Sequence, residues 1–152
     1  MIFENNDPKV EVPQKDLTSV VLQRVDELKE KSALIDGVSG RTLSYYELRS
    51  QIDHLATGLH QRSFKKGDVC AVFCPNLPEY ATIFLGVAAI GGINTTVNSL
   101  YSINDLIHQF NDSKAKFLIT IPEFMDRALP AAEKCGIEEI FVLGEAQGAT
   151  SF

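Results

Sequence analysis

The residues best placed to do chemistry lie in the short turn from Cys74 to Asn76, between an apolar run and a predicted helix. The first amides of a helix lack partners within it, and its dipole is positive there, so such a turn can attract an anion. Asn76 and Glu79, however, have the spacing of a capping box, whose side chains would occupy those amides. The turn also lacks glycine, and Pro78 removes one donor. We therefore expect a structural cap here rather than an anion site.

Other patterns that bind phosphate or perform catalysis are not found. Gly86, Gly91 and Gly92 do not form the G-x-G-x-x-G pattern of a dinucleotide site, and no segment matches the G-x-x-x-x-G-K-[ST] phosphate loop. The histidines fall on predicted helices and are expected at the surface or its boundary; they are His54, His60 and His108. No Ser, His and Asp set can be assembled from the sequence alone. We assign no residue a catalytic, cofactor-binding or metal-binding role.

The cysteines are expected to be buried thiols. Cys70 and Cys74 point to the same side of a predicted interior strand, and Cys135 ends a later helix. Free cysteine is among the most buried residue types, and an odd number cannot pair completely. A metal site would need more ligands in better spacing.

A strand, a helix and a second strand around this turn form the predicted centre of the fold. Residues 69–74 are an apolar run that fits a strand buried on both faces. A helix enclosed by other layers follows over 76–90, and Gly91 and Gly92 end it. Residues 93–97 alternate as a strand does. Such a unit implies two parallel strands joined by a right-handed crossover.

Upstream, the sequence predicts a leader, a helix and a hairpin. Residues 1–15 have no apolar period and are expected to be extended. A helix capped by Asp16 or Thr18 follows; its apolar stripe is Leu17, Val21, Val25 and Leu28. Residues 33–36 and 41–44 flank a glycine-containing loop, which is typical of a small hairpin.

A longer helix follows the hairpin and reaches about Arg62. Ser44 and Glu47 have the capping-box spacing that starts it. Its buried stripe is predicted to be Leu48, Ile52, Leu55, Ala56 and Leu59. Gly58 inside it costs ~1 kcal/mol relative to alanine, which a close helix contact would offset.

Downstream, helices and strands continue to alternate. Ser102 and Asp105 start a short helix, and a strand follows over 117–121. Pro122 opens a helix that Pro130 should kink and that ends at Cys135 and Gly136; a last strand covers 139–143. The tail 145–152 is expected to be flexible and to form no element. The alternation predicts an α/β fold: an open, mostly parallel sheet with helices on both faces, preceded by a helix and a small β-hairpin.

Composition restricts the class of protein further. The 152 residues are the size of one domain, and a 45% hydrophobic, 22% charged chain is ordinary for a soluble globular protein. No uncharged apolar run approaches the ~20 residues that span a bilayer, and the start of the chain does not resemble a secretory signal. The net charge of −6, with Lys65 and Lys66 the one adjacent basic pair, argues against nucleic acid and anionic membranes as partners. We expect cytosolic or organelle-matrix residence and small-molecule or protein partners.

Four segments together resemble the amino-terminal part of the adenylate-forming acyl-CoA synthetases, especially the branch of 4-coumarate-CoA ligase and firefly luciferase. They are ALIDGVSGRTLSYYEL at 33–48, LATGL at 55–59, KKGDVCAVFCPNLPEYATIFLGVAAIGGINTTVN at 65–98 and IHQFNDSKAKFLIT at 107–120. Their order and spacing are those of the family. The resemblance implies that 16–144 is the first part of a larger AMP-binding domain, between the leader 1–15 and the tail 145–152.

The resemblance also implies a reaction in two steps. A carboxylate attacks the α-phosphate of ATP, with Mg²⁺, to give an acyl-adenylate and pyrophosphate; the thiol of coenzyme A then displaces AMP. The family's phosphate loop ending in Pro-Lys-Gly, its Tyr-Gly-x-Thr-Glu segment, its ribose-binding Asp and its lid lysine are not in this sequence. The resemblance therefore places no catalytic or ATP-binding residue here, and it predicts a scaffold that is inactive alone and able to associate with the missing ligase segments.

Three functions remain open at this point. The chain is a portion of a ligase of fatty acid or phenylpropanoid metabolism, a non-catalytic α/β interaction module that pairs with a ligase, or an unrelated flavodoxin-like or receiver-like domain. The acidic cluster that binds Mg²⁺ in receiver-like domains is not visible. Some relatives are peroxisomal, but Thr150, Ser151 and Phe152 do not make an S-K-L address.

Overall fold

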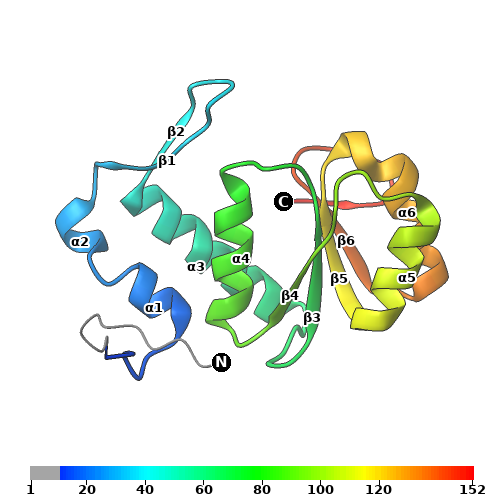
Figure 1. Cartoon of the computed structure of the whole chain (residues 1–152), viewed down its shortest axis with the longest axis horizontal. Coiled ribbons are helices and arrows are strands. Elements are labelled where there is room, and N and C mark those ends of the chain that lie inside the picture. Colours follow the sequence, from blue (N-terminus) through cyan, green and yellow to red (C-terminus); the bar gives the residue numbers. More distant parts are fainter. Residues whose placement is uncertain (1–10) are drawn as a thin grey trace, which may run out of the picture.

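Parallel strands form the sheet around which the chain is organised (Figure 1). The structure is a computed structural model that describes residues 11–152. Among these residues the sheet has five strands, in the order β4 (Ile93–Thr96), β3 (Val69–Phe73), β5 (Ala115–Thr120), β6 (Glu139–Val142) and β7 (Thr150–Ser151). Each strand is parallel to its neighbours. The predicted parallel sheet is confirmed.

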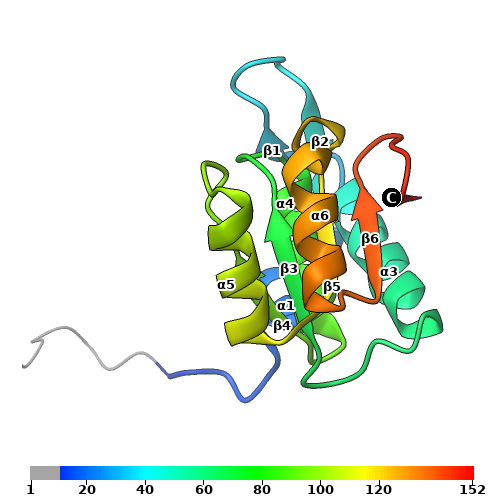
Figure 2. The ribbon, with the colours of Figure 1, turned by 90° about the vertical axis from the view of Figure 1, so that its right-hand side faces the viewer.

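Helices cover both faces of this sheet, as predicted (Figures 1 and 2). One face carries α5 (Ile103–Ser113), the 3₁₀ turn η1 (Pro122–Phe124) and α6 (Met125–Cys135). The other face carries α3 (Tyr45–Gln61) and α4 (Glu79–Ala89). Two short helices form a further layer: α1 (Leu17–Val21) contacts α4, and α2 (Val25–Leu28) contacts α3.

β3 is buried on both of its faces, because side chains alternate along a strand. Ala71 and Phe73 pack into the cluster made with α5 and α6, whereas Cys70 and Val72 pack into the cluster made with α3 and α4. All four side chains are fully buried. The prediction of a strand enclosed on both sides is therefore confirmed, and β3, α4 and β4 form the expected parallel unit.

Two capping boxes confirm predicted helix starts. Ser44 accepts from the Glu47 amide while Glu47 accepts from the Ser44 amide, and Ser102 and Asp105 do the same at α5. Gly91 at φ +73° ends the α4 segment, and Gly136 at φ +69° ends α6. α6 continues through Pro130.

The predicted first helix is interrupted, and its buried stripe is wrong in part. Asp16 caps α1 through the Ser19 amide, as expected, at 2.8 Å. Leu17 and Val21, however, are 51% and 47% exposed. The reason is that the buried Thr18 hydroxyl donates to the carbonyl of Leu85 on α4, at 2.8 Å, and this bond turns the Thr18 side of α1 inwards. The predicted leader, 1–15, lies mostly outside the described residues.

The tail contains an element that the sequence did not predict. β7 pairs with β6, with Phe141 opposite Thr150 and Val142 opposite Ser151. The Thr150 hydroxyl also donates to Glu139, at 2.8 Å. The expectation that 145–152 forms no element is wrong, because main-chain pairing with β6 requires no apolar side chain of its own.

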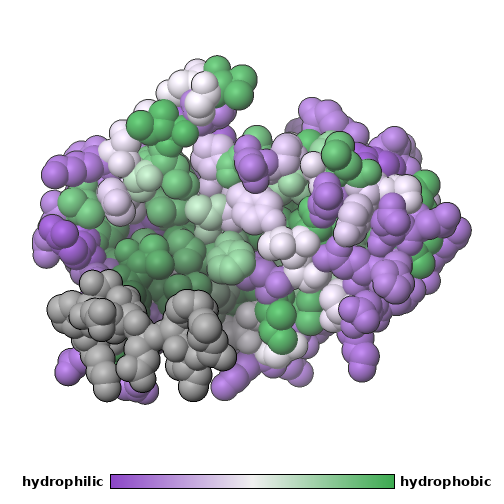
Figure 3. Space-filling view, viewed as in Figure 1, coloured by the Kyte–Doolittle hydropathy of each residue, from purple (hydrophilic) through white to green (hydrophobic). Residues whose placement is uncertain are grey.

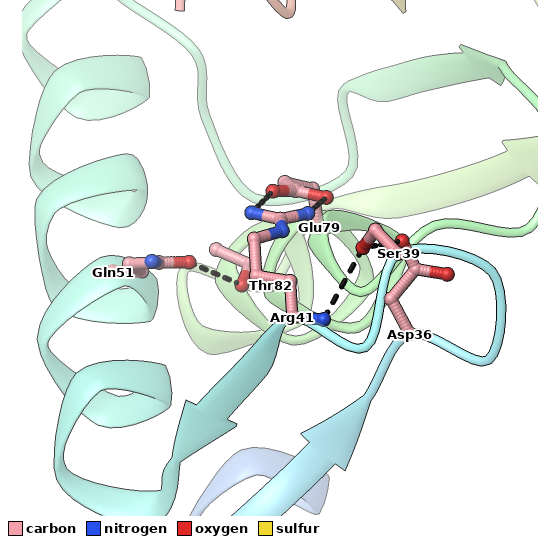
Figure 4. Close-up of polar contacts among 6 residues, drawn as sticks. All are labelled: Asp36, Ser39, Arg41, Gln51, Glu79 and Thr82. Atoms are coloured by element: carbon pink, nitrogen blue, oxygen red, sulfur yellow. Dashed lines mark hydrogen bonds and ion pairs between the residues drawn. The ribbon is translucent and has the colours of Figure 1, made fainter.

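The β1–β2 hairpin joins the rest of the fold through apolar contacts and an ion pair, and Ala33 and Leu34 of β1 pack against the same cluster as Leu43. β1 (Ser32–Ile35) is antiparallel to β2 (Thr42–Ser44), and Leu43 is buried against α3 and α4. Next to β2, Arg41 donates to both carboxylate oxygens of Glu79, at 2.5 and 2.8 Å (Figure 4). Figure 4 also shows the Thr82 hydroxyl donating to Gln51, at 3.0 Å, which links α4 to α3.

Apolar residues also remain on the surface. Figure 3 shows them gathered beside α1 and α4, whereas the face over α5 and α6 is mostly hydrophilic. Exposed large apolar side chains of α1 and α4 are Leu17, Val21 and Phe84.

Gly86, rather than Gly58, makes the close contact between α3 and α4. A Cβ at Gly86 would lie 2.7 Å from Leu55 Cδ2, whereas a Cβ at Gly58 would meet only the end of Arg62, at 3.9 Å. The close helix contact that could offset the cost of Gly58 therefore lies at Gly86 instead.

This difference predicts opposite effects of two alanine substitutions. Gly86→Ala should lower the free energy of unfolding by ~1–3 kcal/mol, because α3 and α4 must move apart. Gly58→Ala, the matched control, should raise it by up to about 1 kcal/mol, because alanine favours a helix. Urea denaturation of both variants measures the change; equal effects would contradict the proposed packing.

The Arg41–Glu79 pair predicts a stability effect that depends on pH. The hydrogen bond from Arg41 lowers the pKa of Glu79 below its ordinary value. The pair therefore stabilises the fold above the unfolded-state pKa of about 4.3, and this contribution is lost as the pH falls through the lower folded-state pKa. Because Arg41 is half exposed, Glu79→Gln should cost only ~0.5–1 kcal/mol at pH 7.

The measurement is urea denaturation of wild type and Glu79→Gln at pH 7 and pH 3. The difference between them should close at the lower pH. Glu27→Gln, in the exposed pair with Arg24, is the control and should have almost no effect at either pH. A Glu79→Gln deficit of equal size at both pH values would show that the ion pair is not its cause.

Candidate functional site

A cleft lies at the carboxyl end of the sheet, between the chain leaving β3 and the chain leaving β4. The chain after β3 turns to α4 on one face, whereas the chain after β4 turns to α5 on the other. Open α/β sheets bind their ligands where neighbouring connections separate in this way. The cleft has a volume of about 560 Å³ and is lined by Cys74, Pro75, Asn76, Tyr80, Thr96, Val97, Asn98 and Ser99.

The cleft contains the Cys74–Asn76 turn, but the predicted capping box is wrong. α4 begins at Glu79, and no side chain caps it. Glu79 instead bonds to Arg41, 38 residues away in the sequence. The amides of Tyr80 and Ala81 donate to backbone carbonyls, those of Leu77 and Pro78, at 3.0 and 3.2 Å. These two amides are thus occupied, as expected, but by backbone carbonyls rather than by the side chains of Asn76 and Glu79.

The groups around the cleft are polar and neutral. Amide, hydroxyl and phenol groups come from Asn76, Tyr80, Thr96, Asn98 and Ser99, and no charged side chain is among the lining residues. Burial is the main cause that raises the pKa of the Tyr80 phenol. The arrangement can donate and accept hydrogen bonds, but it offers no cation to balance the charge of a phosphate.

Arg127 holds the loop beside this cleft, although no sequence pattern singles it out. Its Nη1 donates to the carbonyls of Ser99 and Tyr101, at 3.0 and 2.7 Å. The guanidinium also lies over the rings of Phe73 and Phe124, 5.0 and 4.7 Å from their centres. Arg127 therefore connects α6 to the chain after β4. Its hydrogen-bond partners are backbone groups, which leave no pattern in the sequence.

Burial disfavours the thiolate form of all three cysteines. Burial raises the pKa of the Cys70 thiol to about 12, and burial together with the charge of Glu79 raises that of Cys74 to about 11. Burial also raises the pKa of Cys135, which is partly exposed. The thiolate is the nucleophile and the metal ligand, so these thiols are suited to packing. Their predicted burial is confirmed for Cys70 and Cys74 and only in part for Cys135.

The predicted surface histidines, His54, His60 and His108, are all exposed. His54 borders a second hollow, a groove of about 530 Å³ between α3 and the end of β6. The groove is mainly apolar, and its walls include Leu55, Leu59, Phe141 and Leu143. Within residues 11–152, no three His, Cys, Asp or Glu side chains are grouped to hold a metal ion, and no helix is long and apolar enough to cross a bilayer.

Sequence comparison relates the chain to CoA ligases. It is 34% identical over 131 residues to 4-coumarate–CoA ligase 4 of Arabidopsis thaliana. The matched region covers 83% of this chain and 23% of that protein. It is 30% identical over 145 residues to probable 4-coumarate–CoA ligase 1 of Dictyostelium discoideum. Here the matched region covers 91% of this chain and 26% of the relative. The chain thus spans about a quarter of the length of these relatives.

Solved structures share the fold. A long-chain-fatty-acid–CoA ligase from Archaeoglobus fulgidus matches 97% of this chain and 31% of its own, with a TM-score of 0.87 at 22% identity. An anthranilate CoA ligase, crystallised with anthranoyl-AMP, matches 92% of this chain and 27% of its own, with a TM-score of 0.83 at 18% identity. The model of the family described as AMP-binding enzyme matches residues 21–149. The chain therefore belongs to the AMP-binding enzymes, of whose larger domain it contains an amino-terminal portion.

Proposed function

We propose that this chain is the amino-terminal scaffold of an ATP-dependent carboxylic acid–CoA ligase and is inactive alone. The reaction of the whole enzyme would be acid and ATP to acyl-adenylate and pyrophosphate, followed by acyl transfer to coenzyme A. The observation that carries the proposal is the family match over residues 21–149, in a sequence without the family's phosphate loop.

The groups in the carboxyl-end cleft support the inactivity of the isolated chain. Transfer of an adenylyl group requires cations and hydrogen-bond donors aimed at the developing charge. The cleft side chains are neutral, and the described residues hold no carboxylate cluster for a metal ion. These residues do not fit ATP with Mg²⁺ on their own, so we propose that other parts of the ligase bind ATP, Mg²⁺ and coenzyme A.

The role proposed for these residues is to position the carboxyl end of the sheet. The Thr120 hydroxyl donates to the carbonyl of Phe73, at 2.7 Å, which joins the ends of β5 and β3. Arg127 holds the loop after β4 through its hydrogen bonds to the carbonyls of Ser99 and Tyr101. These contacts hold in place the loops that carry the neutral hydrogen-bonding groups of the cleft. Later segments of a ligase would complete a binding site beside them.

A non-catalytic interaction module is a second candidate function. The exposed apolar side chains of α1 and α4 favour it, because such surface marks sites of protein contact. An interaction module would bind to a complete ligase as a separate partner. A scaffold would instead form the amino-terminal part of the ligase itself. Co-expression with an intact ligase tests the module: a stable complex would favour it.

The proposal predicts that the purified chain with ATP, Mg²⁺, coenzyme A and a panel of fatty and phenylpropanoid acids releases no AMP above the acid-free background. Intact Arabidopsis 4-coumarate–CoA ligase 4 is the positive control. Acid-dependent AMP release by the isolated chain would contradict its inactivity.

A chimera tests the scaffold itself. In it, this chain replaces the matching residues of the Arabidopsis ligase, and we expect acid-dependent AMP release to return, because the shared fold should support the remaining segments. A chimera that folds but forms no AMP with any acid would contradict the scaffold role.

A further inference from the structure

The segment that follows β6, residues 145–152, is held to the fold by few apolar contacts. None of its side chains is fully buried, and Phe152 is 44% exposed. Two glycines with positive φ turn the chain back towards the edge of the sheet, Gly144 at +129° and Gly148 at +82° (Figure 2). Segments with few buried apolar contacts open locally, at a lower free energy than global unfolding. Residues 145–152 are therefore expected to be less stable than the strands beside them.

Backbone pairing adds only a short ladder to this attachment. β7 is two residues long and lies at one end of the strand order. The amide of Phe152 continues the ladder, because it donates to the carbonyl of Val142, at 2.8 Å. The Ser151 hydroxyl donates to the carbonyl of Gly144, at 2.7 Å, which closes the segment on itself. Side-chain bonds to other elements therefore matter for holding the segment in place.

One carboxylate joins the segment to two further elements. The Oε1 atom of Glu139 accepts from the Thr150 hydroxyl, at 2.8 Å, and from Nε of Arg62, at 3.1 Å. Glu139 begins β6, Thr150 begins β7, and Arg62 caps the carboxyl end of α3. Hydrogen bonds to an ionised acceptor are stronger than those between neutral groups. A single oxygen atom thus connects β6, β7 and α3.

Arg62 has further contacts that orient it towards this carboxylate. Its guanidinium lies over the ring of Phe141, 5.3 Å from the centre, and its Nη1 donates to the carbonyl of Gly58, at 3.4 Å. The side chain of Glu139 is 27% exposed. The preceding residue, Glu138, is 61% exposed and lies 3.9 Å from Lys116. The two neighbouring glutamates therefore differ in burial and in partners.

We propose that Glu139 is a latch. Its carboxylate holds residues 145–152 closed against β6 and α3, and loss of its two hydrogen bonds lets this segment open while the other strands stay paired. Ser151 and Phe152 line the apolar groove that α3 borders. Opening of the latch therefore widens this groove and uncovers the edge of β6 that pairs with β7.

The test is amide hydrogen exchange of the purified chain, measured by NMR at Phe152 and Leu143. The Phe152 amide reports on the latch, whereas the Leu143 amide donates to the carbonyl of Thr120, at 3.0 Å, and reports on the other side of β6. Glu139→Gln should speed exchange at Phe152 by about threefold or more, because a neutral acceptor binds both donors more weakly. Exchange at Leu143 should not change. Glu138→Gln is the matched control and should alter neither amide.

A second substitution separates a latch from a single hydrogen bond. Arg62 is linked to Thr150 through Glu139, so Arg62→Gln should speed exchange at Phe152 by about twofold or more. It should add nothing in a chain that already carries Glu139→Gln, because the two residues then no longer act as a unit. Raising the salt concentration from about 0.05 M to 0.5 M should speed exchange at Phe152 in the wild type more than in Glu139→Gln, because salt screens the ion pair.

Faster exchange at Phe152 alone, in both Glu139→Gln and Arg62→Gln, supports the latch. Equal rates in Glu139→Gln and Glu138→Gln overturn it. So does an equal acceleration at Leu143, since the substitution would then weaken the whole sheet. An Arg62→Gln effect that is undiminished in the Glu139→Gln chain also overturns the latch, because Arg62 would then act independently of the carboxylate.

Discussion

Enclosure of β3 is the constraint on which the rest of the structure depends. The strand pairs with β4 on one side and β5 on the other, and its side chains fill the cores on both faces of the sheet. No polar side chain fits such a position without a partner, so the run from Val69 to Phe73 is apolar throughout. Helices on both faces follow, because each side of the strand must be covered.

The same enclosure determines where chemistry can be placed. Since the interior of the sheet is filled, polar groups gather where the strands end, and the cleft between β3 and β4 lies there. Arg127 and Thr120 stabilise that edge through bonds to backbone carbonyls. The described residues thus place neutral donors at the carboxyl end of the sheet, and they leave a mainly apolar groove and a separate two-stranded hairpin beside it.

Local patterns predicted local structure well, and distant partners account for the errors. The boxes at Ser44 and Ser102 were identified because both members of each lie within one turn. Glu79 has the same spacing from Asn76, yet its bond to Arg41 crosses 38 residues, which no local pattern reveals. Gly86 and β7 were missed for the same reason: one depends on Leu55 of another helix, the other on main-chain pairing with β6. The carboxyl-end cleft could be placed from the strand order, but Arg127 could not.

Native-state hydrogen exchange of the β3 amides tests the central claim most directly. If β3 organises the fold, its amides should exchange only through global unfolding, at the slowest rates in the chain and with the free energy that urea denaturation gives. Amides of α1 and α2, which form the outer layer, should exchange faster. Exchange of β3 through a local opening, at rates like those of α1, would show that the sheet is not the framework described here.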